Sequence, residues 1–354
     1  MKAPVKIAVL AFGLYLTSAA VFAQPRVVNA QLSTRSAASG LDRELRSLIA
    51  SLSGPAWAGY SVPMIEGDHR MCCSDSSDCC GTCRLEGRSS GGGASTGSNQ
   101  VSLESDNQLL VLYRIEAGGV QKIRMFSPGC ELDAGGLPFY WITSVRPTDS
   151  VAWLVSYATR PDEQRDHLAD SAVAAIALHR DPEADRALES FVSVSQPESL
   201  RERTAFWLGN ARGKRGYNAL RRMMQEDPSE RVRDKVTFAL TQSREPEALD
   251  TLIEAAHNDK STRVRGQALF WLAQKAGKKA EAAITAAIEN DPETEIKKRA
   301  VFALSQMPKD EGVPLLIQVA RTNKNPVVRK QAMFWLGQSN DPRALAFFEQ
   351  ILKD

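Results

Sequence analysis

Apolar positions in the second half of the chain recur with the period of packed helices. Within residues 245–276, apolar side chains mark one helical face over 248–256, Asn258-Asp259 interrupts the pattern, and 264–272 resume it. Each such unit predicts a helical hairpin. Its apolar stripes can be buried only against neighbouring hairpins, because a single hairpin has no second layer to cover them.

The hairpin pattern repeats with a fixed period. Phenylalanines occupy equivalent places 32 residues apart, at Phe206, Phe238, Phe270, Phe302 and Phe334. A leucine stands two residues after each of them, and an arginine or lysine five residues before. A register held without insertion is the mark of a stacked repeat protein. It predicts an all-α solenoid over residues 149–354, with about six and a half repeats of 32 residues.

The residue that follows each phenylalanine alternates between large and small. Trp207, Trp271 and Trp335 alternate with Ala239 and Ala303. Large and small side chains in alternate layers would let successive hairpins interlock. The tryptophans therefore have two interpretations, as core packing or as aromatic rings that line a protein-binding groove.

Residues 24–148 have a different character, rich in Gly and Ser and holding every cysteine of the chain. The pattern predicts a helix over 41–52, a flexible Gly/Ser loop over 87–100, a hairpin of strands over 109–115 and 120–126, and a strand over 139–143. We expect a small α+β domain in front of the solenoid.

The cysteines form one dense cluster and one outlier: Cys72, Cys73, Cys79, Cys80, Cys83 and Cys130. An even number in an exported chain favours structural disulfides, whose pairing the sequence does not choose. Two alternatives remain. Cys80-Gly-Thr-Cys83 has the spacing of zinc ligands, with His69 or Cys72 and Cys73 to complete the set, and the same CxxC could be redox-active.

The amino terminus predicts export. Residues 1–23 carry Lys2 and Lys6, an apolar run and then Val21-Phe22-Ala23, which fits a cleaved signal peptide. We therefore expect a periplasmic or secreted protein with no membrane span after cleavage. The formal net charge of +2 gives no reason to expect a nucleic-acid partner.

The repeats resemble the HEAT family, in its short bacterial form with HEAT-like or bilin-lyase-type repeats. The carriers are a V-R-x-x-A-x-x-x-L pattern and an acid six residues before the basic residue. The resemblance implies a structural ladder of ion pairs: Asp227 with Arg233, Asp259 with Arg265, and Asp291 with Lys297. Asn323 stands before Arg329, a departure that would weaken one rung.

Residues 55–65, 83–87 and 123–143 resemble the amino-terminal part of exported bacterial HEAT-repeat proteins, which implies an architecture and a compartment but no activity. No Gly-rich phosphate loop, H-E-x-x-H or G-x-S-x-G is present, and none of the four histidines begins a His-Glu pair. We expect a non-catalytic scaffold, without metal or cofactor, whose solenoid binds another protein that is itself periplasmic or membrane-associated. The alternative is a thiol or metal sensor in the cysteine domain.

The last helix, residues 342–352, adds one more candidate surface. Its apolar face includes Phe347, and no second helix follows it in this sequence. That face either docks a partner or caps the stack.

Overall fold

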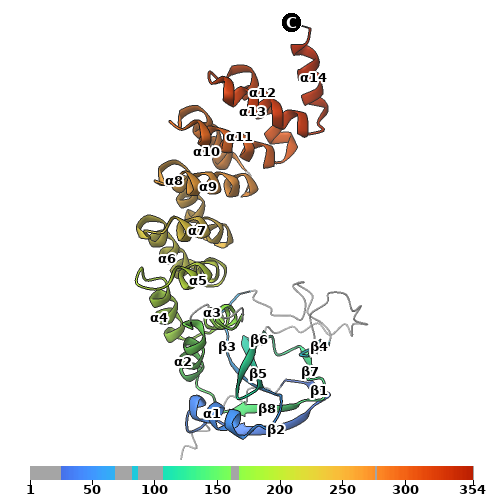
Figure 1. Ribbon diagram of the computed structural model, residues 1–354, viewed down its shortest axis with the longest axis vertical. Helices are drawn as coiled ribbons and strands as arrows, with labels where there is room; N and C mark the ends of the chain where they lie inside the picture. Colours follow the sequence, from blue (N-terminus) through green and yellow to red (C-terminus); the bar gives the residue numbers. More distant parts are fainter. Residues whose placement is uncertain (1–24, 68–81, 87–106, 161–166, 276, 354) are drawn as a thin grey trace, which may run out of the picture.

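The computed structural model describes residues 25–67, 82–86, 107–160, 167–275 and 277–353. A small α+β domain forms one end of the molecule, and a curved column of helical hairpins rises from it (Figure 1). The predicted fold class, an all-α solenoid preceded by an α+β domain, is confirmed.

The α+β domain is built on a five-stranded mixed sheet in the order β2-β8-β3-β5-β6. Its strands are β2 (Gln31–Ser36), β3 (Ala56–Pro63), β5 (Gln108–Glu116), β6 (Gly119–Phe126) and β8 (Pro138–Thr143). A smaller sheet contains β1 (Val27–Val28), β7 (Glu131–Asp133) and β4 (Thr82–Arg84). The helix α1 (Leu41–Ser51), the β5-β6 hairpin and β8 agree with the sequence prediction; the loop predicted over 87–100 lies outside the described residues.

The central strand β3 was not predicted. Nearly all of its residues are buried, on both faces of the sheet, so it lacks the apolar-polar alternation that identifies a half-buried strand. One face, with Ala58 and Tyr60, belongs to a core shared with the helices. The other face, with Trp57, packs with Cys83 and Cys130 in a separate core.

The helices alternate along the column between an outer and an inner row. The outer helices are α2 (Pro147–Ala158), α4 (Pro182–Phe191), α6 (Gly213–Glu226), α8 (Glu247–Asn258), α10 (Lys278–Asn290), α12 (Lys309–Thr322) and α14 (Pro342–Ile351). The inner helices are α3 (Leu168–Leu178), α5 (Glu198–Ala211), α7 (Glu230–Gln242), α9 (Thr262–Lys275), α11 (Thr294–Gln306) and α13 (Pro326–Gln338).

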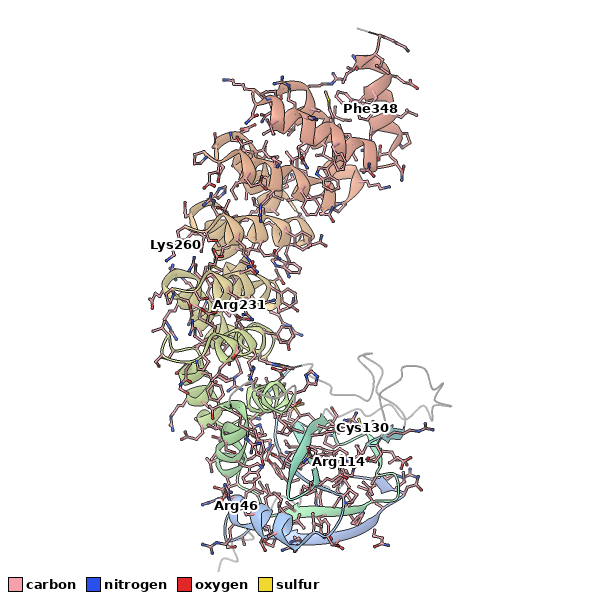
Figure 2. All side chains as sticks on the ribbon, viewed as in Figure 1. Arg46, Arg114, Cys130, Arg231, Lys260 and Phe348 are labelled. Carbon is pink, nitrogen blue, oxygen red and sulfur yellow. The ribbon has the colours of Figure 1, made fainter. Side chains whose placement is uncertain are left out.

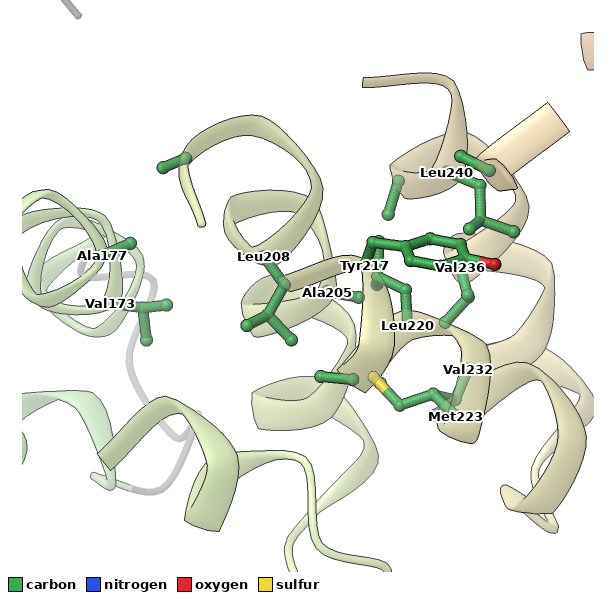
Figure 3. Packing of buried hydrophobic residues seen from close by; sticks show 14 of the residues in the cluster. Val173, Ala177, Ala205, Leu208, Tyr217, Leu220, Met223, Val232, Val236 and Leu240 are labelled. Atoms are coloured by element: carbon green, nitrogen blue, oxygen red, sulfur yellow. The ribbon is translucent and has the colours of Figure 1, made fainter. Parts of the chain in front are cut away.

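Neighbouring inner helices pack more closely than neighbouring outer helices. The column therefore curves with the inner row on its concave side, toward the side on which the α+β domain projects (Figure 1). The core continues from hairpin to hairpin: it includes Leu208 of α5, Leu220 and Met223 of α6, and Val236 of α7 (Figure 3). No helix within the described ranges is both long and apolar enough to cross a bilayer.

The α+β domain and the solenoid share one continuous hydrophobic core, which extends from α1 to α14. At the junction, main-chain hydrogen bonds join Ile65 to Leu178 (2.9 Å) and Arg180 to Pro63 (2.9 Å). The predicted boundary after residue 148 lies in the first turn of α2, which packs against the sheet. The two parts are thus joined by packing as well as by sequence.

A buried hydrogen-bond chain crosses the same junction. The Tyr113 hydroxyl bonds that of Tyr60 (2.7 Å), Tyr60 bonds Ser150 (2.7 Å), and Ser150 bonds Nε2 of His179 (2.8 Å). Nδ1 of His179 lies 2.6 Å from the Ala175 carbonyl, which can only accept, so Nδ1 carries the proton and Nε2 accepts from Ser150. Burial lowers the pKa of His179 to about 4, so its imidazole is neutral near pH 7.

We expect the fold to lose stability in acid through His179. In the unfolded chain its pKa is about 6.5, so between about pH 6.5 and pH 4 the unfolded state binds a proton that the folded state rejects. The contribution of His179 to the free energy of unfolding is fully present above this window. It is lost as the pH falls through the window, by about 3 kcal/mol in total. Urea unfolding from pH 7.5 to pH 4 measures it.

His179→Gln should flatten this slope, whereas His257→Gln, which removes an exposed histidine on α8, should leave it unchanged. Equal slopes in the native protein and His179→Gln would contradict the assignment.

Candidate interaction surface and ladder

The phenylalanines that mark the repeat form a column of half-exposed rings on the inner helices. Phe206 stacks on Phe238 with ring centroids 6.0 Å apart and planes 14° apart, and Phe270 stacks on Phe302 at 6.2 Å and 10°. Phe334 ends the column with 54% of its surface exposed. Sequence reasoning used these residues only to set the register, because phenylalanine in a repeat is usually core.

The tryptophans lie on the core side of these phenylalanines. The ring centroid of Trp271 is 4.8 Å from that of Phe238 in the preceding hairpin and 4.9 Å from that of its neighbour Phe270. Trp335 repeats this arrangement with Phe302 (5.0 Å) and Phe334 (5.0 Å), and Trp207 contacts Phe206 (5.2 Å). All three tryptophans are partly buried and packed against the main core.

This geometry explains the two-unit period. Where alanine follows the phenylalanine, at Ala239 and Ala303, the ring stacks directly on the phenylalanine of the preceding unit. Where tryptophan follows, the indole inserts between two phenylalanines. We name the eight rings the aromatic stripe: Phe206, Trp207, Phe238, Phe270, Trp271, Phe302, Phe334 and Trp335. The phenylalanines supply its exposed part, and the tryptophans pack beneath.

A column of amides accompanies the stripe. The residues four positions after each phenylalanine are Asn210, Gln242, Gln274, Gln306 and Gln338. Residues four apart share one face of a helix, and all but the half-buried Gln242 are exposed. Each inner helix thus presents an aromatic ring and an amide together, an apolar surface next to a group that both donates and accepts hydrogen bonds.

The ladder predicted from the repeats is present, but its register differs from the prediction. Arg233 does not pair with the carboxylate of Asp227 in its own turn; it forms a bidentate pair with Asp259 of the next hairpin, at 2.8 and 3.0 Å. Its Nη1 donates to the main-chain carbonyl of Asp227 (2.8 Å). Each rung therefore joins two consecutive hairpin turns, which an intra-unit pair would not do.

The same correction applies along the stack. Arg201, which the sequence did not place in the ladder, pairs with Asp227 at 2.8 and 3.1 Å. Nε of Arg265 lies 3.5 Å from Oδ2 of Asp291, and its Nη2 donates to Oε1 of Glu293 (2.5 Å). Asp291 thus belongs to Arg265 and not to Lys297.

Phe347, which was predicted as a candidate binding residue, is buried. Its side chain is 3% exposed, and the guanidinium of Arg321 lies 5.3 Å from its ring centroid. Phe347 therefore caps the stack and does not belong to the candidate binding surface. Its neighbour Phe348, near the far end of the column, is half-buried (Figure 2).

The cysteine predictions fall largely outside the described residues. That is true of Cys72, Cys73, Cys79 and Cys80, and of His69. Cys83 and Cys130 are both buried in the second core of the α+β domain, where Figure 2 labels Cys130. The disulfides, the zinc site and the redox CxxC remain predictions.

Comparison with known families matches residues 186–273 and 281–354 to HEAT repeats. HEAT repeats therefore make up the solenoid from residue 186 onward, apart from the short segment between the two matches. This HEAT solenoid fits a protein-interaction scaffold, because stacked hairpins offer a long continuous surface. Comparison with curated proteins gives no match.

Several solved structures are similar to the chain at low identity. Human deoxyhypusine hydroxylase in complex with glycerol shares 18% identity over 59% of this chain and 91% of its own, with a TM-score of 0.26. The CpcE–CpcF complex of phycocyanin lyase from Nostoc sp. PCC7120 shares 23% identity over 44% of this chain and 99% of its own, with a TM-score of 0.32. Kap95p bound to RanGDP shares 19% identity over 60% of this chain and 33% of its own, with a TM-score of 0.38.

Proposed function

We propose that the protein is an exported, non-catalytic scaffold that binds an extended segment of another protein along the concave face of its HEAT solenoid. The observation that carries the proposal is the aromatic stripe with its amide column. Exposed rings provide apolar contact for partner side chains, and aromatic residues are enriched among interface hot spots. The amides can bond the main chain of an extended segment, whose donors and acceptors otherwise stay unpaired.

The two columns also set the geometry of the partner. Both run from one hairpin to the next with the same 32-residue period, so ring and amide return together at every step. A segment that lies along the column can place an apolar side chain on a ring and a peptide group at an amide in each step. An extended chain fits such a surface better than a globular face, because only the former exposes its main chain.

We expect substitutions in the aromatic stripe to weaken partner binding without unfolding the protein. Phe270→Ser together with Phe302→Ser removes two stacked rings from the concave face. We expect a Kd for the captured partner at least about thirtyfold weaker, the effect of losing a hot spot of about 2 kcal/mol. The partner is first captured by the full-length native protein after mild cross-linking, then purified and titrated against each variant.

Ile253→Ser is the matched control, since it makes the same kind of change on the half-exposed face of α8 in the outer row. Its Kd should equal that of the native protein. Full-length protein is used throughout, because the core continues from the sheet into α2 and α3. Equal affinity of the stripe variant and the control, with both folded, would reject the concave face as the binding surface.

The export part of the proposal rests on residues 1–23 of the sequence. We expect the mature protein to begin at Gln24 and to occur outside the cytoplasm. Mass spectrometry of the amino terminus after cell fractionation tests this directly. An intact Met1 in a cytoplasmic fraction would contradict export and would leave the solenoid surface to serve a cytoplasmic partner.

A further inference from the structure

One rung of the ion-pair ladder is missing, and both of its members are changed. The register that joins Arg201 to Asp227 and Arg233 to Asp259 joins position 297 to position 323, where the chain has Lys297 and Asn323. Asn323, the departure noted in the sequence, thus falls in the same rung as Lys297, which stands where the neighbouring rungs have arginine. No carboxylate is supplied there by the ladder.

The side chains at this rung do not form an ion pair, because asparagine carries no charge. Oδ1 of Asn323 accepts from the main-chain N–H of Asn325 (3.0 Å), as Oδ1 of Asp259 accepts from Ser261 (2.8 Å). The Nδ2 group of Asn323 therefore occupies the place in which Asp259 presents Oδ2 to an arginine. The rung thus has a neutral amide and an ammonium where the other rungs have a carboxylate and a guanidinium. Lys297 instead donates to the main-chain carbonyl of Glu289 (2.7 Å).

A cavity of about 440 Å³ opens at this place, lined among others by Lys297, Asn323 and Asn325. The outer helices α10 and α12 pack less closely beside it than α8 and α10 do in the hairpins before. The space is large enough for a small organic acid or an acidic side chain, since a water molecule takes about 30 Å³.

The charges around the cavity favour an anion. Lys297 and Lys324 line it, and Glu289 is the acidic lining residue, with an exposed side chain. Arg329 adds positive charge to the same turn, because its Nη1 donates to the main-chain carbonyls of Asn323 (2.8 Å) and Lys324 (3.1 Å). Ammonium and amide donors that converge on one space bind a carboxylate by charge-assisted hydrogen bonds.

We propose that this cavity is a carboxylate-binding site, in which a carboxylate supplied from outside the ladder takes the place of the absent acid at position 323. The same chemistry can come from a free dicarboxylate or from an acidic side chain of a bound protein. The site is separate from the aromatic stripe and does not depend on it.

The test is calorimetric titration of the full-length mature protein with sodium succinate, at constant ionic strength set with sodium chloride. A second arm uses a blocked peptide, Gly-Gly-Glu-Gly-Gly, against the same peptide with Gln for Glu. We expect saturable binding of succinate, of the Glu peptide, or of both. Binding of succinate alone assigns the site to a free acid; binding of the Glu peptide and not the Gln peptide assigns it to an acidic side chain.

Asn323→Asp is the decisive variant, because it restores the acid of the other rungs and fills the site from within. We expect it to fold, to unfold at a higher temperature than the native protein, and to bind the carboxylate about tenfold more weakly or not at all. Lys297→Gln should lose binding without the gain in unfolding temperature. Lys330→Gln, an exposed lysine on α13 that does not line the cavity, is the matched control and should bind as the native protein does.

The proposal is overturned if neither succinate nor the Glu peptide binds to the native protein. It is also overturned if Asn323→Asp and Lys297→Gln bind as tightly as Lys330→Gln, since binding would then come from diffuse surface charge.

Discussion

Arg233→Ala is expected to lower the free energy of unfolding by about 3–5 kcal/mol, the cost of leaving one partner of a buried ion pair uncompensated. The side chains of Arg233 and Asp259 are only 2% and 5% exposed. Their bidentate pair joins two consecutive hairpin turns. The same guanidinium also donates to two main-chain carbonyls of its own turn, so truncation frees four acceptor atoms at once.

The measurement is urea unfolding combined with amide hydrogen exchange, because repeat arrays can lose structure locally. We expect protection to fall first in α7, α8 and α9. Lys297→Ala is the matched control at the missing rung, where no buried carboxylate depends on the cation; it should cost less than about 1 kcal/mol.

A double variant separates the ion pair from general packing. Arg233→Met with Asp259→Leu replaces both charges by apolar groups of similar size, which leaves no unpaired buried charge. We expect it to be more stable than Arg233→Ala alone. If Arg233→Ala were as stable as Lys297→Ala, the ladder would contribute nothing to the stack.

The sequence predicted the solenoid because its determinants are local and repeated. The apolar faces of each hairpin lie within one 32-residue unit, and the same pattern recurs along the chain. The β5-β6 hairpin was predicted for a similar reason: Glu116-Ala117-Gly118-Gly119 separates two β-like runs. Such features require no knowledge of distant contacts.

Which carboxylate pairs with each arginine of the ladder could not be predicted from local sequence. Asp227 is six residues from Arg233 in sequence, whereas Asp259 is 26 residues away. Sequence proximity favoured the wrong carboxylate, because the distance between consecutive turns is set by how hairpins stack. The unusual rung was hidden for the same reason, since Lys297 and Asn323 belong to different repeats and were assigned to different pairs.

The hydrogen-bond chain at the junction and the aromatic stripe were not predicted, for two other reasons. Tyr60, Ser150 and His179 lie 90 and 29 residues apart in sequence, and nothing local marks them as a chain. In the sequence the half-exposed phenylalanines look like core residues, because phenylalanine is among the residues most often buried. A possible sequence clue was the amide four residues after each phenylalanine, which a fully buried helix face would not carry.

Trp271→Ala is expected to lower the free energy of unfolding by about 3–5 kcal/mol, the usual cost of deleting a large aromatic side chain from a packed site. The indole fills the space between Phe238 and Phe270, and nothing in the facing layer can replace it because the next unit has alanine at the equivalent place. Urea unfolding of the full-length protein measures the loss. Unchanged stability would remove Trp271 from the core.

Two matched variants show whether volume or chemistry is responsible. The Trp271 Nε1 atom is buried with no hydrogen-bond partner among the described residues, so Trp271→Phe removes an unsatisfied donor together with part of the ring. We expect it to retain most of the stability that Trp271→Ala loses. Phe334→Ala deletes the exposed terminal ring and should cost much less than Trp271→Ala, since about half of its surface already contacts water. An equal loss at both positions would mean that the whole stripe is core and would weaken its assignment as a binding surface.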